Sequence, residues 1–135
     1  MKQITILLTS LLFIGLAIFS GCSKDEENIE KWIIGTWDID RYVQQDIEDG
    51  VVTSESESTD QGEIVFRDDG TGEDIGGNFS GSVFTWTNTD TTLEITQGQT
   101  TTIYDIETFS SSIFIFSITE EYPDKTSIER WYFSK

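Results

Sequence analysis

Histidine is absent from these 135 residues, and cysteine, proline and methionine each occur once. Without histidine the chain lacks the commonest general base and the most frequent ligand of transition metals. The single cysteine, Cys22, excludes an intramolecular disulfide bond. The domain must therefore be held together by packing, and we predict no catalytic residue, no metal site and no cofactor.

Basic residues are also scarce, because 8 Lys and Arg oppose 25 Asp and Glu and give a formal net charge of −17. Proteins that bind nucleic acids need clustered Lys and Arg to neutralise phosphates. We therefore exclude nucleic acid as a partner. The acidity does not indicate disorder, because aromatic residues make up 13% of the chain and supply the apolar area of a core.

The first 21 residues have the pattern of a secretory signal peptide. Lys2 supplies the positive charge, and residues 4–19 are mainly apolar. A transmembrane anchor is the alternative, because about 20 apolar residues span a bilayer. The small residues before Cys22, in Phe19-Ser20-Gly21-Cys22, resemble the lipobox of bacterial lipoproteins. This resemblance implies that residues 1–21 are removed and that lipid on Cys22 attaches the mature protein to a membrane.

Residues 22–28 form the predicted tether between the lipid and the domain. Its Ser23-Lys24-Asp25-Glu26-Glu27 is similar to the export signal that directs lipoproteins of Bacteroidetes-type bacteria to the outer face of the outer membrane. The alternative is a solvated linker, because short charged runs are usually solvated. We expect an outer-membrane location facing the cell surface, with a periplasm-facing lipoprotein as the alternative.

Residues 29–135 form the predicted domain. Asn28–Ile34 is expected to be a short helix that covers one end, because apolar residues recur there at spacings of three and four. The rest alternates short runs rich in Thr, Val, Ile and aromatics with turn residues, which is typical of consecutive strands. The predicted strands are Thr36–Gln45, Glu63–Arg67, Thr71–Asp74, Phe79–Thr87, Thr91–Gln97, Thr100–Thr108, Ile113–Glu121 and Thr126–Phe133. The first strand is expected to place Trp37, Ile39 and Val43 on one face and Tyr42 on the other.

Eight strands joined mostly by short turns favour an antiparallel up-and-down barrel. A two-sheet sandwich is the alternative, since it accepts the same strand count. The acidic, serine-rich segment Asp46–Asp60 has almost no apolar residues, so we expect a long loop there.

Four short motifs carry a resemblance to a known group of proteins: Gly35-Thr36-Trp37, Phe66-Arg67-Asp68-Asp69-Gly70-Thr71-Gly72, Phe84-Thr85-Trp86 and Tyr104-Asp105-Ile106. Together they resemble the small lipocalin-like lipoprotein domains of Bacteroidetes. The resemblance implies a calycin-type barrel that binds a small apolar molecule, and it implies no catalytic residue.

The predicted ligand site consists of aromatic residues expected on inward faces. They are Trp37, Phe66, Phe84, Trp86, Tyr104, Phe116 and Trp131. The same residues would equally form a filled core, because protein interiors are normally tightly packed. In that case we expect an interaction or structural module of an envelope protein complex, with Asp46–Asp60 as its contact loop.

Two other functions of the acidic residues, a calcium site and glycoside hydrolysis, are less favoured by the sequence. Four carboxylates between Asp68 and Asp74 suit calcium in their chemistry, but they lack the spacing of an EF-hand loop, and a hairpin turn explains them. Pairs of carboxylates can hydrolyse glycosides, yet no pair is singled out by the sequence. We therefore predict a protein that is not an enzyme.

Overall fold

The computed structural model describes residues 32–77, 79 and 83–135. These residues form nine strands and no complete helix. The strands are β1 (Gly35–Glu48), β2 (Val51–Thr59), β3 (Glu63–Phe66), β4 (Thr71–Ile75), β5 (Phe84–Asn88), β6 (Thr92–Gln97), β7 (Thr100–Phe109), β8 (Ile113–Glu121) and β9 (Thr126–Ser134). The helix predicted over Asn28–Ile34 lies largely outside the described residues. Of the part that is described, Trp32 and Ile33 are helical.

Eight of the strands close into a barrel. They follow the order β1-β3-β4-β5-β6-β7-β8-β9, and β9 returns to pair with β1. Every pairing is antiparallel. The predicted all-β, eight-stranded antiparallel barrel is therefore confirmed, and the sandwich alternative is wrong because the ring of pairings is complete. The whole ring lies within residues 35–134.

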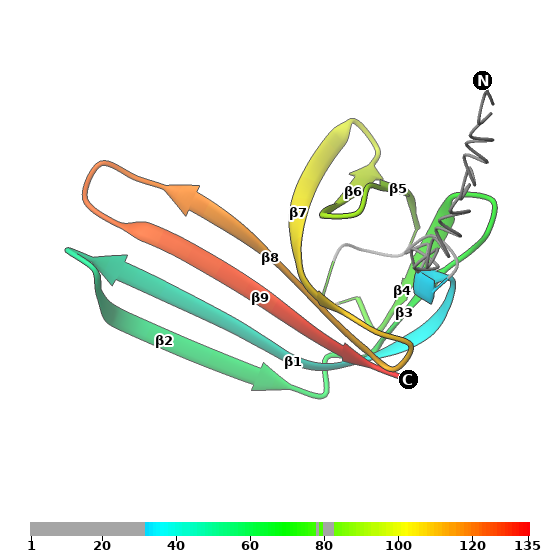
Figure 1. The fold of residues 1–135 in the computed structure, drawn as a ribbon, viewed down its shortest axis with the longest axis horizontal. Helices are drawn as coiled ribbons and strands as arrows, with labels where there is room; N and C mark the ends of the chain where they lie inside the picture. The colour runs from blue at the N-terminus through cyan, green and yellow to red at the C-terminus, as the bar shows by residue number, and fades with distance from the viewer. Residues whose placement is uncertain (1–31, 78, 80–82) are drawn as a thin grey trace, which may run out of the picture.

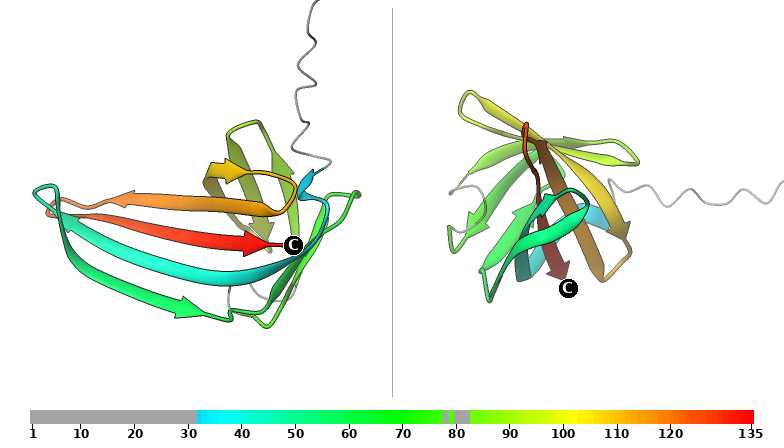
Figure 2. Two further views of the ribbon diagram at one scale, coloured as in Figure 1. Left: turned by 60° about the horizontal axis from the view of Figure 1, so that its bottom comes forward. Right: turned by 90° about the vertical axis from the view of Figure 1, so that its left-hand side faces the viewer.

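Long strands carry one side of the barrel outward into an arm. We define the arm as β2 with residues 41–48 of β1, residues 126–130 of β9 and residues 117–121 of β8, which pair in the order β2-β1-β9-β8. Figures 1 and 2 show these four strands projecting side by side from the rest of the barrel. Strands β7 and β8 pair only from Asp105 and Ser117 toward their turn. Beyond that pair the two strands part, and the barrel wall opens at the base of the arm (Figure 1).

The expectation of a loop over Asp46–Asp60 is wrong. β1 continues to Glu48, and β2 returns along it from Val51 to Thr59. The turn between them is Asp49-Gly50, with φ of 51° and 78°, which is the geometry of the tightest hairpin turns. All nine β2 residues are exposed, so burial imposes no apolar alternation that the sequence could reveal.

A bulge in β1 changes which side chains face inward. Ile39 lies opposite Phe133 and Tyr42 lies opposite Trp131, with the register shifting between Ile39 and Arg41. Since Trp131 and Phe133 share one face of β9, Tyr42 joins the inward face. Because the bulge inserts one extra residue, Val43 lies opposite Arg130 and not on the face of Trp37 and Ile39 as expected, although it is buried, with 7% exposed.

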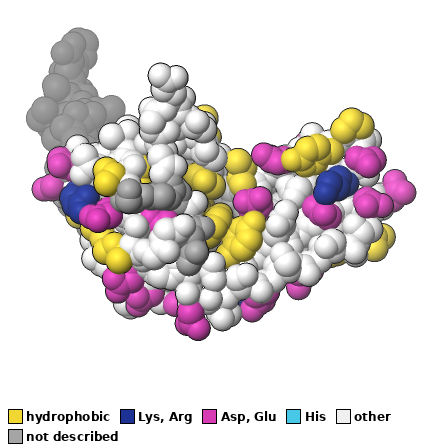
Figure 3. Space-filling model, turned by 180° about the vertical axis from the view of Figure 1, so that it is seen from behind, with side chains coloured by type: hydrophobic (Ala, Val, Ile, Leu, Met, Phe, Trp, Pro, Cys, Tyr) yellow, Lys and Arg dark blue, Asp and Glu magenta, His cyan; other side chains and the backbone are white. Residues whose placement is uncertain are grey.

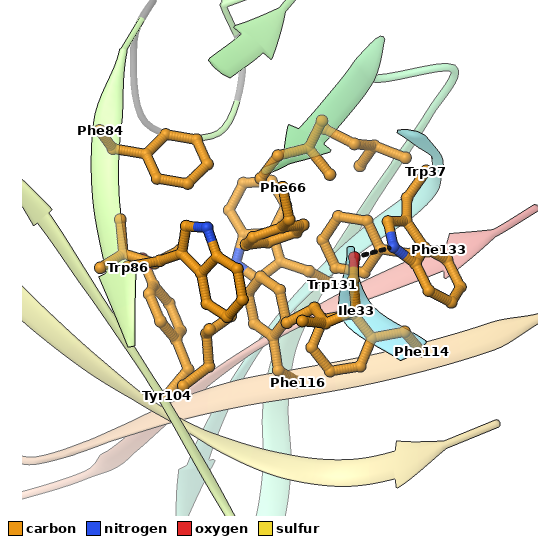
Figure 4. Packing of buried hydrophobic residues seen from close by; sticks show 14 residues of the cluster. Ile33, Trp37, Phe66, Phe84, Trp86, Tyr104, Phe114, Phe116, Trp131 and Phe133 are labelled. Carbon is orange, nitrogen blue, oxygen red and sulfur yellow. Dashed lines mark hydrogen bonds between the residues drawn. The ribbon is translucent and has the colours of Figure 1, made fainter. Parts of the chain in front are cut away.

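The interior is packed with large apolar side chains from every ring strand except β4, whose buried positions are Gly72 and Asp74 (Figure 4). Trp37, Phe114 and Phe116 are fully buried. Burying a side chain of this size contributes roughly 1.5–3 kcal/mol to folding. Ile33 closes one end of the core, and its carbonyl oxygen accepts a hydrogen bond of 2.8 Å from the Trp37 indole nitrogen (Figure 4).

Candidate functional site

All seven aromatic residues of the predicted ligand site belong to one buried cluster. Their exposed fractions range from 0% for Trp37 to 9% for Tyr104. The rings contact one another directly, with centroids 5.4 Å apart for Phe66 and Trp86 and 4.7 Å apart for Tyr104 and Phe116. The structure thus brings the predicted residues together as a packed interior, and their role in binding stays a prediction.

The cluster reaches the surface where β7 and β8 part. The rings of Tyr42 and Trp131 lie 4.3 Å apart there, and the ring of Phe79 lies 4.8 Å from Trp131 and 5.6 Å from Tyr104. We call Tyr42, Phe79, Tyr104, Glu129 and Trp131 the junction. Figure 3 shows hydrophobic side chains at the surface between the barrel body and the arm, below a notch in the outline of the molecule.

Asp74 fixes the position of Phe79 through hydrogen bonds to the backbone. Its carboxylate accepts hydrogen bonds from the backbone nitrogens of Gly77, at 3.2 Å, and Phe79, at 2.8 Å. Asp74 is only 4% exposed, and a buried carboxylate needs such donors. This explains an acidic residue on the inner side of β4. Phe79 lies outside the strands, so the expectation that a strand begins at Phe79 is wrong.

Glu129 gives the junction a negative charge beside two phenols. Burial, then the charge of Glu129 and a hydrogen bond with it, together raise the pKa of Tyr42 to about 12. Burial followed by the charge of Glu129 also raises the pKa of Tyr104 to about 12. Both phenols therefore stay protonated at neutral pH.

Trp131 carries an unpaired donor. Its indole nitrogen is buried and has no hydrogen-bond acceptor in the described part of the chain. The indole nitrogens of Trp37 and Trp86 do have acceptors, the carbonyl oxygens of Ile33 at 2.8 Å and Thr71 at 2.9 Å. Trp131 is therefore the exception among the three tryptophans of the core.

The carboxylates that were considered as calcium ligands bind different protein groups instead of converging on one point. Asp69 accepts hydrogen bonds from the backbone and hydroxyl of Thr71, at 2.9 and 2.6 Å, and Glu73 pairs with Arg67 at 2.6 Å. Across residues 32–77, 79 and 83–135, no three acidic or cysteine side chains are grouped to hold a metal ion. The hairpin explanation of these residues accounts for their contacts.

Two surface pockets lie away from the junction, and acidic residues contribute to the lining of both. One, of about 370 Å³, lies beside Asp68, Asp69 and Trp86, and the other, of about 390 Å³, lies beside Asp38, Asp40, Asp60 and Glu63. Hydrogen bonds from Thr71 lower the pKa of Asp69. A lowered pKa suits a charged acceptor rather than a general acid at neutral pH.

Three junction residues escaped the sequence-based prediction. Tyr42 was placed on the outer face because the bulge was not foreseen, and Phe79 was placed in a strand. Glu129 follows the inward alternation of Trp131 and Phe133 along β9. Extending that alternation by one step would have located Glu129 as an inward-facing acidic residue.

No helix among the described residues has the length and apolar content needed to cross a membrane. No protein family, curated protein or solved structure was found to match this chain.

Proposed function

We propose that this protein is a lipid-anchored lipoprotein of the bacterial cell envelope whose lipocalin-like barrel binds a small, largely apolar molecule at the junction. The observation that carries the proposal is the continuity of the aromatic cluster from the core to the surface where β7 and β8 part. Aromatic walls with a few polar groups are typical of small-molecule sites. Because the interior rings contact one another, the ligand binds at the open end of the cluster rather than in a closed cavity.

The anchoring part of the proposal follows from the signal-like residues 1–21 and from Cys22. Several acyl chains together hold a protein firmly, because each buried methylene contributes about 0.8 kcal/mol. We expect the mature protein to partition with membranes and a Cys22→Ser variant to lose acylation, as measured by metabolic labelling with an alkyne fatty acid. Protease treatment of intact cells then distinguishes a surface-facing from a periplasm-facing domain. A Cys22→Ser variant that is still acylated would contradict the proposal.

The binding part is tested on the chain from Ser23 to Lys135, which contains every strand of the barrel. We expect the neutral fluorescent probe phenylnaphthylamine to bind saturably, and Tyr42→Ala to weaken its binding by removing a ring stacked on Trp131. Val83→Ala is the matched control, because Val83 is 61% exposed and lies outside the junction. Non-saturable fluorescence, or equal binding by the wild type and Tyr42→Ala, would overturn this part.

A second function is favoured by a separate observation on the arm. β2 pairs only with β1 among the described strands, and its nine residues include neither lysine nor proline, which commonly protect sheet edges. Such an edge can accept an extended segment of another protein. This supports the interaction module considered from the sequence, now on a strand rather than a loop.

The interaction function predicts that partners depend on the outer part of the β1–β2 hairpin. A shortened hairpin, in which Asp49-Gly50 joins the paired residues Gln45 and Glu55 directly, keeps the eight-stranded ring because β2 lies outside it. We expect envelope proteins that are cross-linked to the wild type to be lost from this variant. If every cross-linked partner is retained, the second function is wrong.

A further inference from the structure

The unpaired indole nitrogen of Trp131 is costly to the folded protein. Trp131 is 7% exposed, and its ring lies close to the rings of Tyr42 and Phe79. A buried donor without an acceptor loses its hydrogen bonds to water and gains none in return. Natural proteins satisfy nearly all such groups, and an exception in a candidate site is an indication of function.

The position of this donor matches the proposed site. Trp131 and Tyr104 are the junction residues that also belong to the buried cluster, and the ring of Trp131 contacts Phe79 of the junction. Its neighbour across β8 is Phe116 and its neighbour across β1 is Tyr42. An acceptor brought in by a ligand would therefore meet a donor that is already oriented by packing and has no competing protein acceptor among the described residues.

The charge of the junction restricts the ligand further. Glu129 lies two residues from Trp131 on the same face of β9, and the chain as a whole carries a formal net charge of −17. Anionic ligands would be repelled, because burial near a like charge is unfavourable. The Tyr42 hydroxyl donates a hydrogen bond to the Gln44 side-chain oxygen at 3.5 Å, and the nearby charge of Glu129 favours its protonated form.

We propose that the Trp131 indole N–H selects the ligand of the junction, which is a neutral, mostly apolar molecule carrying a carbonyl-type hydrogen-bond acceptor. The inference rests on the proposed binding function and adds the chemical class of the ligand. Trp131 acts as the specificity-determining donor, while Tyr42 and Phe79 supply apolar contact and Glu129 excludes carboxylates.

The experiment compares two neutral naphthalene probes on the chain from Ser23 to Lys135. Prodan carries a ketone acceptor, whereas phenylnaphthylamine carries none. We expect Trp131→Phe to weaken Prodan binding by about threefold to tenfold, which is the value of one hydrogen bond, and to change phenylnaphthylamine binding less than about twofold on the same scale. Trp32→Phe is the matched control, because Trp32 is 37% exposed and lies outside the junction.

A measurement on the unmodified sequence keeps the test independent of how variants fold. The chain has four tryptophans, whose indole N–H signals can be followed by heteronuclear NMR. We expect Prodan to move the Trp131 signal downfield, as a newly formed hydrogen bond does, and phenylnaphthylamine to leave its hydrogen bonding unchanged. The signals of Trp37 and Trp86, whose donors are already bonded, should respond weakly to both probes.

Charge exclusion is tested with the fluorescent fatty-acid anion parinarate. We expect the wild type to bind it at least about tenfold more weakly than Prodan and Glu129→Gln to remove most of that difference, since a like charge nearby is unfavourable. If both naphthalene probes bind but Trp131→Phe and the NMR signal do not distinguish them, the ligand class is wrong and the binding function stands. If neither probe binds saturably, both proposals fail.

Discussion

Replacing Trp131 with phenylalanine should destabilise the barrel much less than the same replacement at Trp37. Both side chains are buried, with exposed fractions of 7% and 0%. The difference between them is the indole nitrogen, which bonds the Ile33 carbonyl in Trp37 and has no acceptor in Trp131 among the described residues. The paired substitutions therefore compare an indole donor that has an acceptor with one that has none.

The magnitude follows from the cost of an unpaired buried group, about 1–3 kcal/mol. Trp37→Phe leaves the buried Ile33 carbonyl without its indole donor and also replaces the indole ring, which lies 4.1 Å from the Lys135 ammonium, with a smaller ring. Trp131→Phe removes a donor that is already unpaired, so the variant no longer carries the free-energy cost of that unpaired group. Shortening the ring costs comparable packing energy in both variants. We therefore expect Trp131→Phe to be more stable than Trp37→Phe by at least about 2 kcal/mol.

The assay is urea unfolding of the chain from Ser23 to Lys135, without added ligand, with unfolding followed by circular dichroism. For a domain of this size a difference of 2 kcal/mol corresponds to about 8 °C or more in Tm, so thermal unfolding gives a second measure. Equal destabilisation by the two substitutions would refute the reasoning. In that case the indole nitrogen of Trp131 has an acceptor in solution, and the argument for its role in ligand selection fails with it.

Two other predictions concern packing and ionisation. Gly72→Ala should destabilise the barrel by about 1–3 kcal/mol in urea unfolding, because a methyl group there would overlap the Phe84 ring; unchanged stability would show that the ring can move aside. In an alkaline absorbance titration, Tyr42 and Tyr104 should ionise near pH 12, and Glu129→Gln should lower both pKa values. Because an ordinary phenol ionises near 10, the wild type should lose stability as the pH rises from about 10 toward 12; ionisation of all four tyrosines near 10 would contradict this.

The barrel could be predicted because its ring strands follow simple patterns. Alternation in Phe84-Thr85-Trp86 places aromatics inward and threonine outward, and the structure agrees in the burial of each residue. The turn at Asp68-Asp69-Gly70 joins β3 to β4 as expected, with φ of 78° at Gly70. These signals are local, because one buried face and one tight turn are enough to define a strand and its register.

The arm could not be predicted in the same way, since it buries little. β2 is exposed on both faces, so its strand conformation depends on pairing with β1 and not on an apolar pattern. The Asp49-Gly50 turn was a usable signal, because this dipeptide favours two-residue hairpins. The bulge between Ile39 and Arg41 left no such signal, and it alone moved Tyr42 into the junction.

The inward face of the long strands also explains why the core ends where the junction begins. Along β9 the inward residues run from Phe133 and Trp131 to Glu129 and Ser127, so their character changes from aromatic to polar. The same change occurs in β1, where Asp46 lies opposite Ser127 and is paired with Lys125 at 2.9 Å. A polar inward face cannot join a dry core without cost. The interior of the ring therefore packs tightly only as far as Trp131. Beyond Trp131 the strands extend as the arm. At this boundary, where we propose that the ligand binds, an aromatic surface is bordered by polar groups.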